Sequence, residues 1–239
     1  LRLRLERGMA GLSLLFLAIT GALLVKDFDR PDRFLNVLLR PQWRSWLVRG
    51  AYILMALGAC DVLWLLHLFF GQGPVTGLRV ALVVFAALGA VYTAFLFAQA
   101  KGRDLWQSPL LPVHMLAQSV KTGSSALLLV ALLGGLGVEP VLVTVLQIAL
   151  AVYLAMLLIE FTLPHVSHDT RAALRLMTHG ALRTPFWAMV ALGNVLPLAL
   201  LVVWPAQGLA MLPAAVLVLT FAAVSEHVWV RAPQLVPLR

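Results

Sequence analysis

The sequence predicts an all-α integral membrane protein, an up-and-down bundle of seven transmembrane helices in a single domain over residues 1–239. Composition is the first reason, because 62% of the residues are hydrophobic and 12% are charged, whereas soluble domains have about 45–50% and about 25%. The second reason is that the apolar runs are long and unbroken, without the alternation of barrel strands. Third, short segments with Gly and Pro separate several runs, which makes consecutive helices antiparallel neighbours.

Seven runs qualify, or nearly qualify, as membrane spans. A helix needs about 20 apolar residues to cross a hydrocarbon core of about 30 Å. In chain order, the runs cover residues 9–25, 47–70, 78–100, 113–135, 140–163, 186–204 and 209–230.

Charge divides the connecting segments between the two sides of the predicted bundle. Of the 18 Lys and Arg residues, 13 fall on the side that carries the segments after the first, third and fifth runs and the C-terminus. We call this the basic side. The positive-inside rule places it in the cytoplasm. Its residues are Lys26, Arg30, Arg33, Arg40, Arg44, Arg49, Lys101, Arg103, Arg171, Arg175, Arg183, Arg231 and Arg239.

Composition also bears on cofactors and partners. Cys60 is the one cysteine, so the chain cannot hold an iron–sulfur cluster on its own thiolates. The six histidines do not pair at one depth inside the runs, so we expect no haem. His165 and His168 look faintly like metal ligands, but a solvated segment is the better interpretation, and no metal site is predicted. We attribute the net charge of +8 to membrane orientation and to contact with lipid or protein rather than nucleic acid.

Two polar residues share one depth on consecutive runs. Tyr92 lies eight residues before the basic-side end of its run, and Lys121 lies eight residues into the next, so each is about 12 Å deep at about 1.5 Å per residue. Ionisable groups at such depth are costly and indicate function. A phenol and an amine there could hold the two ends of a polar ring or share a proton. The plainer alternatives are a packing role for Tyr92 and a structural pairing for Lys121.

Other polar residues lie within the predicted spans. Asp61 is near the middle of the second run, and His67 is near its far end; ionisable groups at such depth indicate function. A satisfied polar residue in the bundle is the alternative for Asp61. Asn194 and Glu226 lie in the basic half, where Asn194 fits a helix–helix hydrogen bond and Glu226 an interfacial position.

Two connecting segments carry a recognisable pattern. The first runs through Asp27, Arg30-Pro31 and Arg33-Phe34 to Ser45-Trp46 and Gly50-Ala51. The second combines Tyr92 with Lys101-Gly102-Arg103, Trp106 and Ser108-Pro109-Leu110-Leu111-Pro112. A third, weaker match is Phe186-Trp187, Gly193 and Pro197-Leu198. Together they resemble the NrfD/PsrC family, the quinone-reactive membrane subunits of multi-subunit respiratory oxidoreductases.

The resemblance implies a function. It implies a membrane anchor subunit that exchanges electrons between membrane quinone (menaquinone or ubiquinone) and a docked iron–sulfur subunit, with proton uptake or release. It also implies a molybdopterin catalytic subunit as a further partner, and a multi-pass location in a bacterial or archaeal inner membrane. No catalytic residue of its own is expected. On this interpretation Tyr92 and Lys121 bind quinone, Asp61 and His67 transfer protons, and the docking face contains Arg30, Arg33, Arg103 and Trp106.

Two features depart from the family pattern. Family members usually have eight or more helices, so we expect an eighth, N-terminal helix that is missing before the first run. Orientation is also in conflict, because the corresponding segments of polysulfide-reductase-like members face the periplasm, while charge counting favours the cytoplasm. The competing functions are a purely structural membrane anchor, in which Lys121 and Tyr92 pair with protein groups, and a proton or ion transporter.

Overall fold

The computed structural model describes residues 2–26, 39–71, 75–163, 167–204 and 208–237. The described residues form helices and no strands, and seven of these helices are long and apolar enough to cross a membrane. The predicted fold class and its seven spans are therefore confirmed. The spans are Glu6–Lys26, Trp46–Phe70, Thr76–Ala98, Leu111–Leu133, Pro140–Thr162, Arg183–Val203 and Ala210–Gln234. The chain divides into two compact units, Leu1–Leu96 and Phe97–Arg239, which we describe separately.

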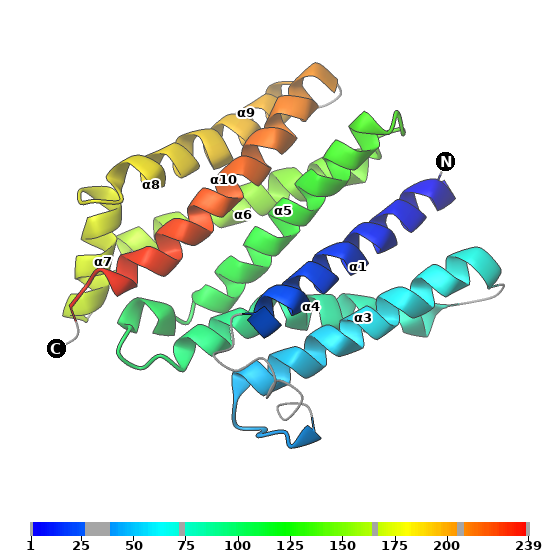
Figure 1. The fold of residues 1–239 in the computed structure, drawn as a ribbon. Helices are drawn as coiled ribbons and strands as arrows, with labels where there is room; N and C mark the ends of the chain where they lie inside the picture. Colours follow the sequence, from blue (N-terminus) through cyan, green and yellow to red (C-terminus); the bar gives the residue numbers. More distant parts are fainter. Residues whose placement is uncertain (1, 27–38, 72–74, 164–166, 205–207, 238–239) are drawn as a thin grey trace. The chain divides into compact units, whose positions relative to one another are not determined.

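The first unit contains α1 (Arg2–Lys26), α3 (Trp46–Phe70) and α4 (Thr76–Ala98). Helices α1 and α3 run antiparallel and lie side by side (Figure 1). Two polar contacts join them: Arg7 donates to the carbonyl of Leu68 over 2.7 Å, and Ser13 donates to Asp61 over 2.6 Å. Such bonds are favoured inside membranes, where polar groups lack water.

Helices α3 and α4 meet through a glycine. A Cβ atom added at Gly50 would overlap the ring of Tyr92, so the missing side chain is what lets the ring lie on the α3 backbone. Nearer the helix ends, Trp46 stacks on Phe95 with ring centroids 4.4 Å apart. Small residues at helix contacts are typical of membrane bundles. The packing of Tyr92 in the first unit is therefore fixed by a feature of α3.

The second unit is a bundle of four spans. Its elements are η2 (Asp104–Gln107), α5 (Leu111–Leu133), α6 (Pro140–Thr162), α7 (His168–Thr178), α8 (Arg183–Val190), the π-helical η3 (Ala191–Val195), α9 (Leu196–Val203) and α10 (Gly208–Gln234). Helix α5 packs against both α6 and α10 (Figure 1). Two apolar clusters fill the interior, one around Tyr153 and Met189 and one around Leu146 and Val218.

Helix α7 differs from the sequence-based expectation. We expected His168 in a solvated connecting segment, but residues 168–178 form a helix and His179 caps its end. The Ser167 hydroxyl starts the helix by accepting from the backbone amides of Asp169 and Thr170, a standard N-cap. Its buried face packs into the apolar cluster around Tyr153 through Ala173, Leu174 and Met177. Tertiary packing thus stabilises a helix too short to be stable alone.

The sixth span is interrupted. The segment Ala191–Val195 is π-helical, and the amide of Leu196 donates to the carbonyl of Ala191, five residues back. Pro197 lacks an amide hydrogen and its ring would crowd the carbonyl four residues before it, which favours a widened turn at this point. Gly193 belongs to this turn, and a Cβ there would overlap Phe221 of α10. Single π-helical turns inside α-helices are frequent at functional sites.

One end of the second unit is held together by its loops. Arg103 donates from Nη1 to the carbonyls of Pro233 and Val236, over 2.7 and 2.6 Å. Trp106 donates from its indole to the carbonyl of Trp229 over 3.2 Å. The Ser167 hydroxyl donates to Asp104. We call the region formed by η2, α7 and the C-terminal end of α10 the basic end of the second unit.

Candidate functional site

Lys121 is the centre of a buried polar cluster in the second unit. Its side chain is 1% exposed on α5. Its ammonium nitrogen lies 2.9 Å from Oδ1 of Asn194, to which it donates, and 3.6 Å from the ring centroid of Tyr153. A desolvated cation over an aromatic face gains about 2 kcal/mol. The ammonium group is therefore held by a neutral hydrogen bond and an aromatic face.

The widened turn at η3 supplies the hydrogen-bond acceptor for Lys121. Asn194 is 1% exposed, and its Nδ2 donates to the carbonyl of Met189 over 2.8 Å. A carbonyl accepts only, so this bond determines which end of the amide carries the donors. Oδ1 is left to face Lys121. The side-chain amide is thereby pre-oriented for a cation by a contact within its own helical segment.

Helix α6 supplies the aromatic wall of the cluster. Tyr153 is completely buried, and its hydroxyl shares a 2.5 Å hydrogen bond with Ser225 of α10. The ring of His114 lies 4.5 Å from the Tyr153 ring and 4.6 Å from that of Trp229. A histidine, a tyrosine and a lysine therefore lie in consecutive contact within one membrane bundle. All three side chains can carry or release a proton.

Helix α10 brings an acidic group to the cluster. Glu226 interacts electrostatically with Lys121, and Gln118 of α5 lies beside the Glu226 carboxylate. The side chain of Glu226 is exposed, whereas those of Lys121 and Gln118 are buried. Ionisable groups inside membranes pair with one another and mark ion or proton pathways. The arrangement thus connects the buried amine to a carboxyl group at the surface of the unit.

The predicted quinone ligands belong to different units. Tyr92 is 8% exposed and lies in the first unit. Lys121 lies in the second, where it contacts Asn194 and Tyr153 and interacts electrostatically with Glu226. The pairing of Tyr92 with Lys121 around one ligand stays a prediction.

The predicted proton-transfer residues lie on α3. Asp61 is 6% exposed and accepts the bond from Ser13 of α1. His67 is near the end of the same helix, with its ring 5.8 Å from that of Trp64. The structure brings Asp61 to Ser13, which the sequence did not indicate. A proton route through Asp61 and His67 stays a prediction.

The predicted docking residues fall into two groups. Arg103 and Trp106 lie at the basic end, where both donate to backbone carbonyls near the C-terminal end of α10. Their role within the chain is to tie η2 to α10. Arg30 and Arg33 lie outside the described residues. A docking role for any of the four stays a prediction.

Sequence reasoning missed part of the cluster. Lys121 was evident because a lysine in an apolar run is exceptional, and Asn194 and Glu226 were noticed for the same reason. Tyr153 and His114 were not linked to it, although both contact Lys121 or its neighbours. The available signal was that Tyr153 lies in the half of its run nearest the basic side. Aromatic residues are common at such positions, which made that signal weak.

A helical membrane chain with an internal cluster of ionisable side chains belongs to the class of multi-pass membrane proteins that contain a buried polar site. The family model described as "Polysulphide reductase, NrfD" matches residues 4–237. The chain therefore belongs to the NrfD family.

One curated relative adds detail. It is a Halobacterium salinarum protein whose name describes it as a putative membrane subunit of dimethyl sulfoxide reductase, and it is 29% identical over 217 residues. The match covers 77% of this chain and 50% of the relative, so the chain spans about half the length of that protein. No solved structure matches the chain significantly.

Proposed function

We propose that this chain is the quinone-reactive membrane subunit of a reductase complex. In this role it exchanges electrons between membrane quinone and a docked iron–sulfur subunit, and it handles the accompanying protons. Membership of the NrfD family and the name of the halobacterial relative support a membrane subunit of a reductase complex. The observation that carries the proposal is the burial of Lys121 beside Asn194, Tyr153 and Glu226 in a membrane-spanning bundle.

The side chains fit a quinone in their donor chemistry. A bound quinone supplies two-electron, two-proton redox chemistry. Its two ring oxygens need hydrogen-bond donors, and a phenol and an ammonium group are both suitable. Tyr92 is held in place by its packing on Gly50, and Lys121 by Asn194. We assign these two residues to quinone binding, each supported by the geometry of its own unit.

Proton handling follows from the same cluster. Removing two electrons from a quinol releases two protons, so the protein must accept them near the ring. Lys121 and Glu226 interact electrostatically. Glu226 is exposed, whereas Lys121 is buried. We propose that protons pass between this pair. Asp61, held by Ser13, and His67 are a further route to be tested on α3.

The partners and the location are part of the proposal. An iron–sulfur subunit would dock near Arg103 and Trp106, with a molybdopterin subunit beyond it. Arg30 and Arg33 belong to the same proposed docking face. The membrane would be the inner membrane of a bacterium or archaeon, with the basic side in the cytoplasm by charge.

The test is quinol-dependent reduction of the iron–sulfur centres in the purified native complex. We expect Tyr92→Phe and Lys121→Met each to lower the rate about tenfold or more, because each removes a donor that would be worth about 1.4 kcal/mol or more in the reaction. Tyr52→Phe and Lys26→Met are matched controls, since they change the same residue types elsewhere in the chain. Subunit composition of each variant complex is checked by gel filtration.

A second function is favoured by one observation. The amine of Lys121 already has protein partners in Asn194 and Tyr153, which is what a purely structural anchor requires. In that case, quinol would not reduce the iron–sulfur centres of the wild-type complex. The Lys121→Met replacement would lower only the thermal stability. If quinol reduced the iron–sulfur centres at the normal rate in both variants, the chain would still be the quinone-reactive subunit. Tyr92 and Lys121 would then not belong to its quinone site.

A further inference from the structure

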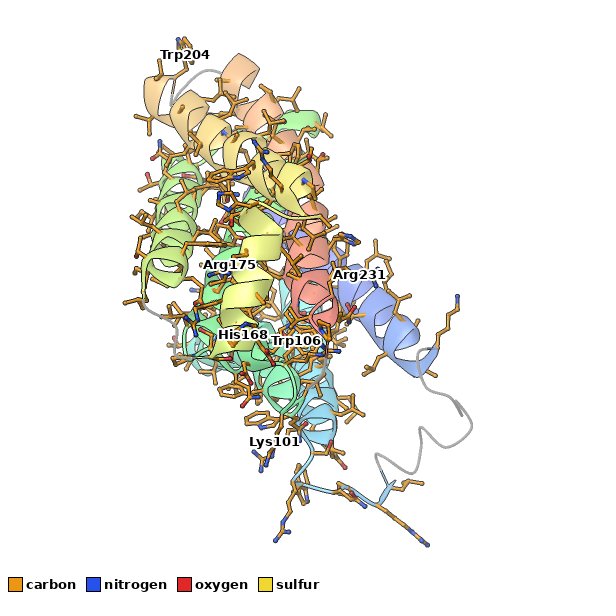
Figure 2. All side chains as sticks on the ribbon, turned by 90° about the vertical axis from the view of Figure 1, so that its left-hand side faces the viewer. Lys101, Trp106, His168, Arg175, Trp204 and Arg231 are labelled. Carbon is orange, nitrogen blue, oxygen red and sulfur yellow. The ribbon has the colours of Figure 1, made fainter. Side chains whose placement is uncertain are left out.

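Helix α7 presents a continuous basic face at the basic end of the second unit. His168, Arg171, Arg175 and His179 are spaced three, four and four residues apart, so they lie along one face of the helix. All four are exposed, while Thr170, Ala173, Leu174 and Met177 on the other face are buried. Figure 2, which looks onto this helix, shows His168 and Arg175 along it, with Arg231 on the neighbouring α10.

A groove runs between this basic face and the C-terminal segment. It has a volume of about 650 Å³. One wall carries the four basic side chains, and the other is apolar, formed by Leu235, Val236 and Pro237. Among the described residues, no acidic side chain lines the groove and neither Arg171 nor Arg175 forms a salt bridge, although Nδ1 of His168 lies 3.5 Å from Oδ1 of Asp169. The charges of the two arginines are therefore not neutralised by a salt bridge within the described part of the chain.

The groove lies at the edge of the membrane. Leu235 directly follows Gln234, the last residue of the seventh span, and α7 joins the spans that end at Thr162 and begin at Arg183. The polar layer on each side of the hydrocarbon core is about 5–8 Å thick. Residues immediately beyond a span therefore lie at the depth of the lipid headgroups.

We propose that this groove binds the headgroup of an anionic phospholipid, with Arg171 and Arg175 holding its phosphate groups. Each guanidinium offers a planar fork of donors that matches phosphate oxygens. The two residues are one turn apart, about 6 Å along the axis, so a headgroup with two phosphates engages both.

The apolar wall favours a lipid over an acidic protein segment as the ligand of the groove. Leu235, Val236 and Pro237 give the first part of an acyl chain or glycerol backbone an apolar surface next to the phosphates. An acidic peptide would use the charge and leave this wall unmatched. Basic pockets beside transmembrane helices are known to bind such headgroups. This inference does not depend on the quinone reaction.

The experiment measures lipid binding to the purified full chain by native mass spectrometry in detergent. The lipids are diphosphatidylglycerol, with two phosphates, and zwitterionic phosphatidylcholine. The test variant is Arg171→Gln with Arg175→Gln. The control is Arg183→Gln with Arg231→Gln, which also removes two exposed charges from the second unit but none from the groove.

We expect the test variant to lower the affinity for the two-phosphate lipid about 30-fold, at about 1 kcal/mol for each arginine near the surface. In the control variant, the affinity for the two-phosphate lipid should fall about fivefold or less. The affinity for phosphatidylcholine should be the same in all variants. Equal losses in both double variants would overturn the proposal in favour of general surface charge.

Two further results would also overturn it. Displacement of the lipid by inorganic phosphate at the same concentration would indicate a site for soluble phosphate. Unchanged lipid binding in the test variant, together with loss of a co-purifying subunit, would assign the groove to an acidic protein partner.

Discussion

At the scale of single residues, the absence of a side chain at Gly50 determines where Tyr92 lies. The ring occupies the space that a Cβ would need. We expect Gly50→Ala to destabilise the protein by about 1–3 kcal/mol, the usual cost of overpacking a well-packed contact. Thermal unfolding in detergent measures this effect. Quinol-dependent reduction should fall as well if the phenol of Tyr92 contacts the quinone, because the ring must move.

The control for this prediction is Gly21→Ala on α1 of the same unit. An added Cβ there meets nothing within 4 Å, so the replacement should be neutral or slightly stabilising, because alanine is the better helix former. If both variants unfolded at the same temperature, the contact between Gly50 and Tyr92 would be wrong.

Single residues also show how far the site could be predicted. A lysine in an apolar run stands out because burying its charge is costly, and Lys121 is buried as expected. Its partners did not stand out in the same way. Asn194 reaches Lys121 because a widened turn places it there. Tyr153 and Ser225 are ordinary residues of apolar helices until packing brings them together.

At the scale of helices, predictability follows the strength of the apolar pattern. Each of the seven runs contains enough apolar residues to specify a span, and each observed span lies within a few residues of its predicted bounds. Helix α7 was not predicted because it is short and half of it is charged or polar. The interruption at η3 was missed because Pro197 alone does not reveal how the helix accommodates it.

The link between η2 and α10 gives a prediction at this scale. Arg103 donates to the carbonyls of Pro233 and Val236, and bonds to a charged donor contribute about 1.5–3 kcal/mol each. We expect Arg103→Gln to release the C-terminal segment, so that amide hydrogen exchange at Leu235 and Val236 rises about tenfold or more, which corresponds to about 1.4 kcal/mol. Exchange in α5 should not change.

Lys101→Gln is the matched control for Arg103→Gln. Lys101 precedes the same η2 segment and is exposed, and its contact with that segment is made by its backbone carbonyl, which accepts from Gln107. Replacing its side chain therefore removes a charge and leaves this bond in place. Faster exchange in both variants would mean that the charge of the segment, rather than the two bonds of Arg103, holds the C-terminal segment.

At the scale of the whole molecule, the order of the spans determines which segments share a side of the membrane. Because spans alternate in direction, the segments around Lys101 and Ala181 must face one side, and Glu139, between α5 and α6, must face the other. The excess of Lys and Arg on the first side predicts that it is cytoplasmic. Family resemblance alone leaves the side open, so the prediction depends on charge.

Cysteine labelling in intact cells measures the topology directly. The background is Cys60→Ser, which removes the one native cysteine, and single cysteines replace Lys101, Ala181 or Glu139. We expect a membrane-impermeant maleimide to label only the Glu139→Cys variant in intact cells, and all three after permeabilisation. Labelling of Lys101→Cys and Ala181→Cys alone would keep the seven-span fold but reverse its orientation, so that the basic segments would owe their charge to a partner or to lipid. Labelling of Lys101→Cys without Ala181→Cys would contradict the order of the spans itself, because α5 and α6 lie between these positions and must return the chain to the same side.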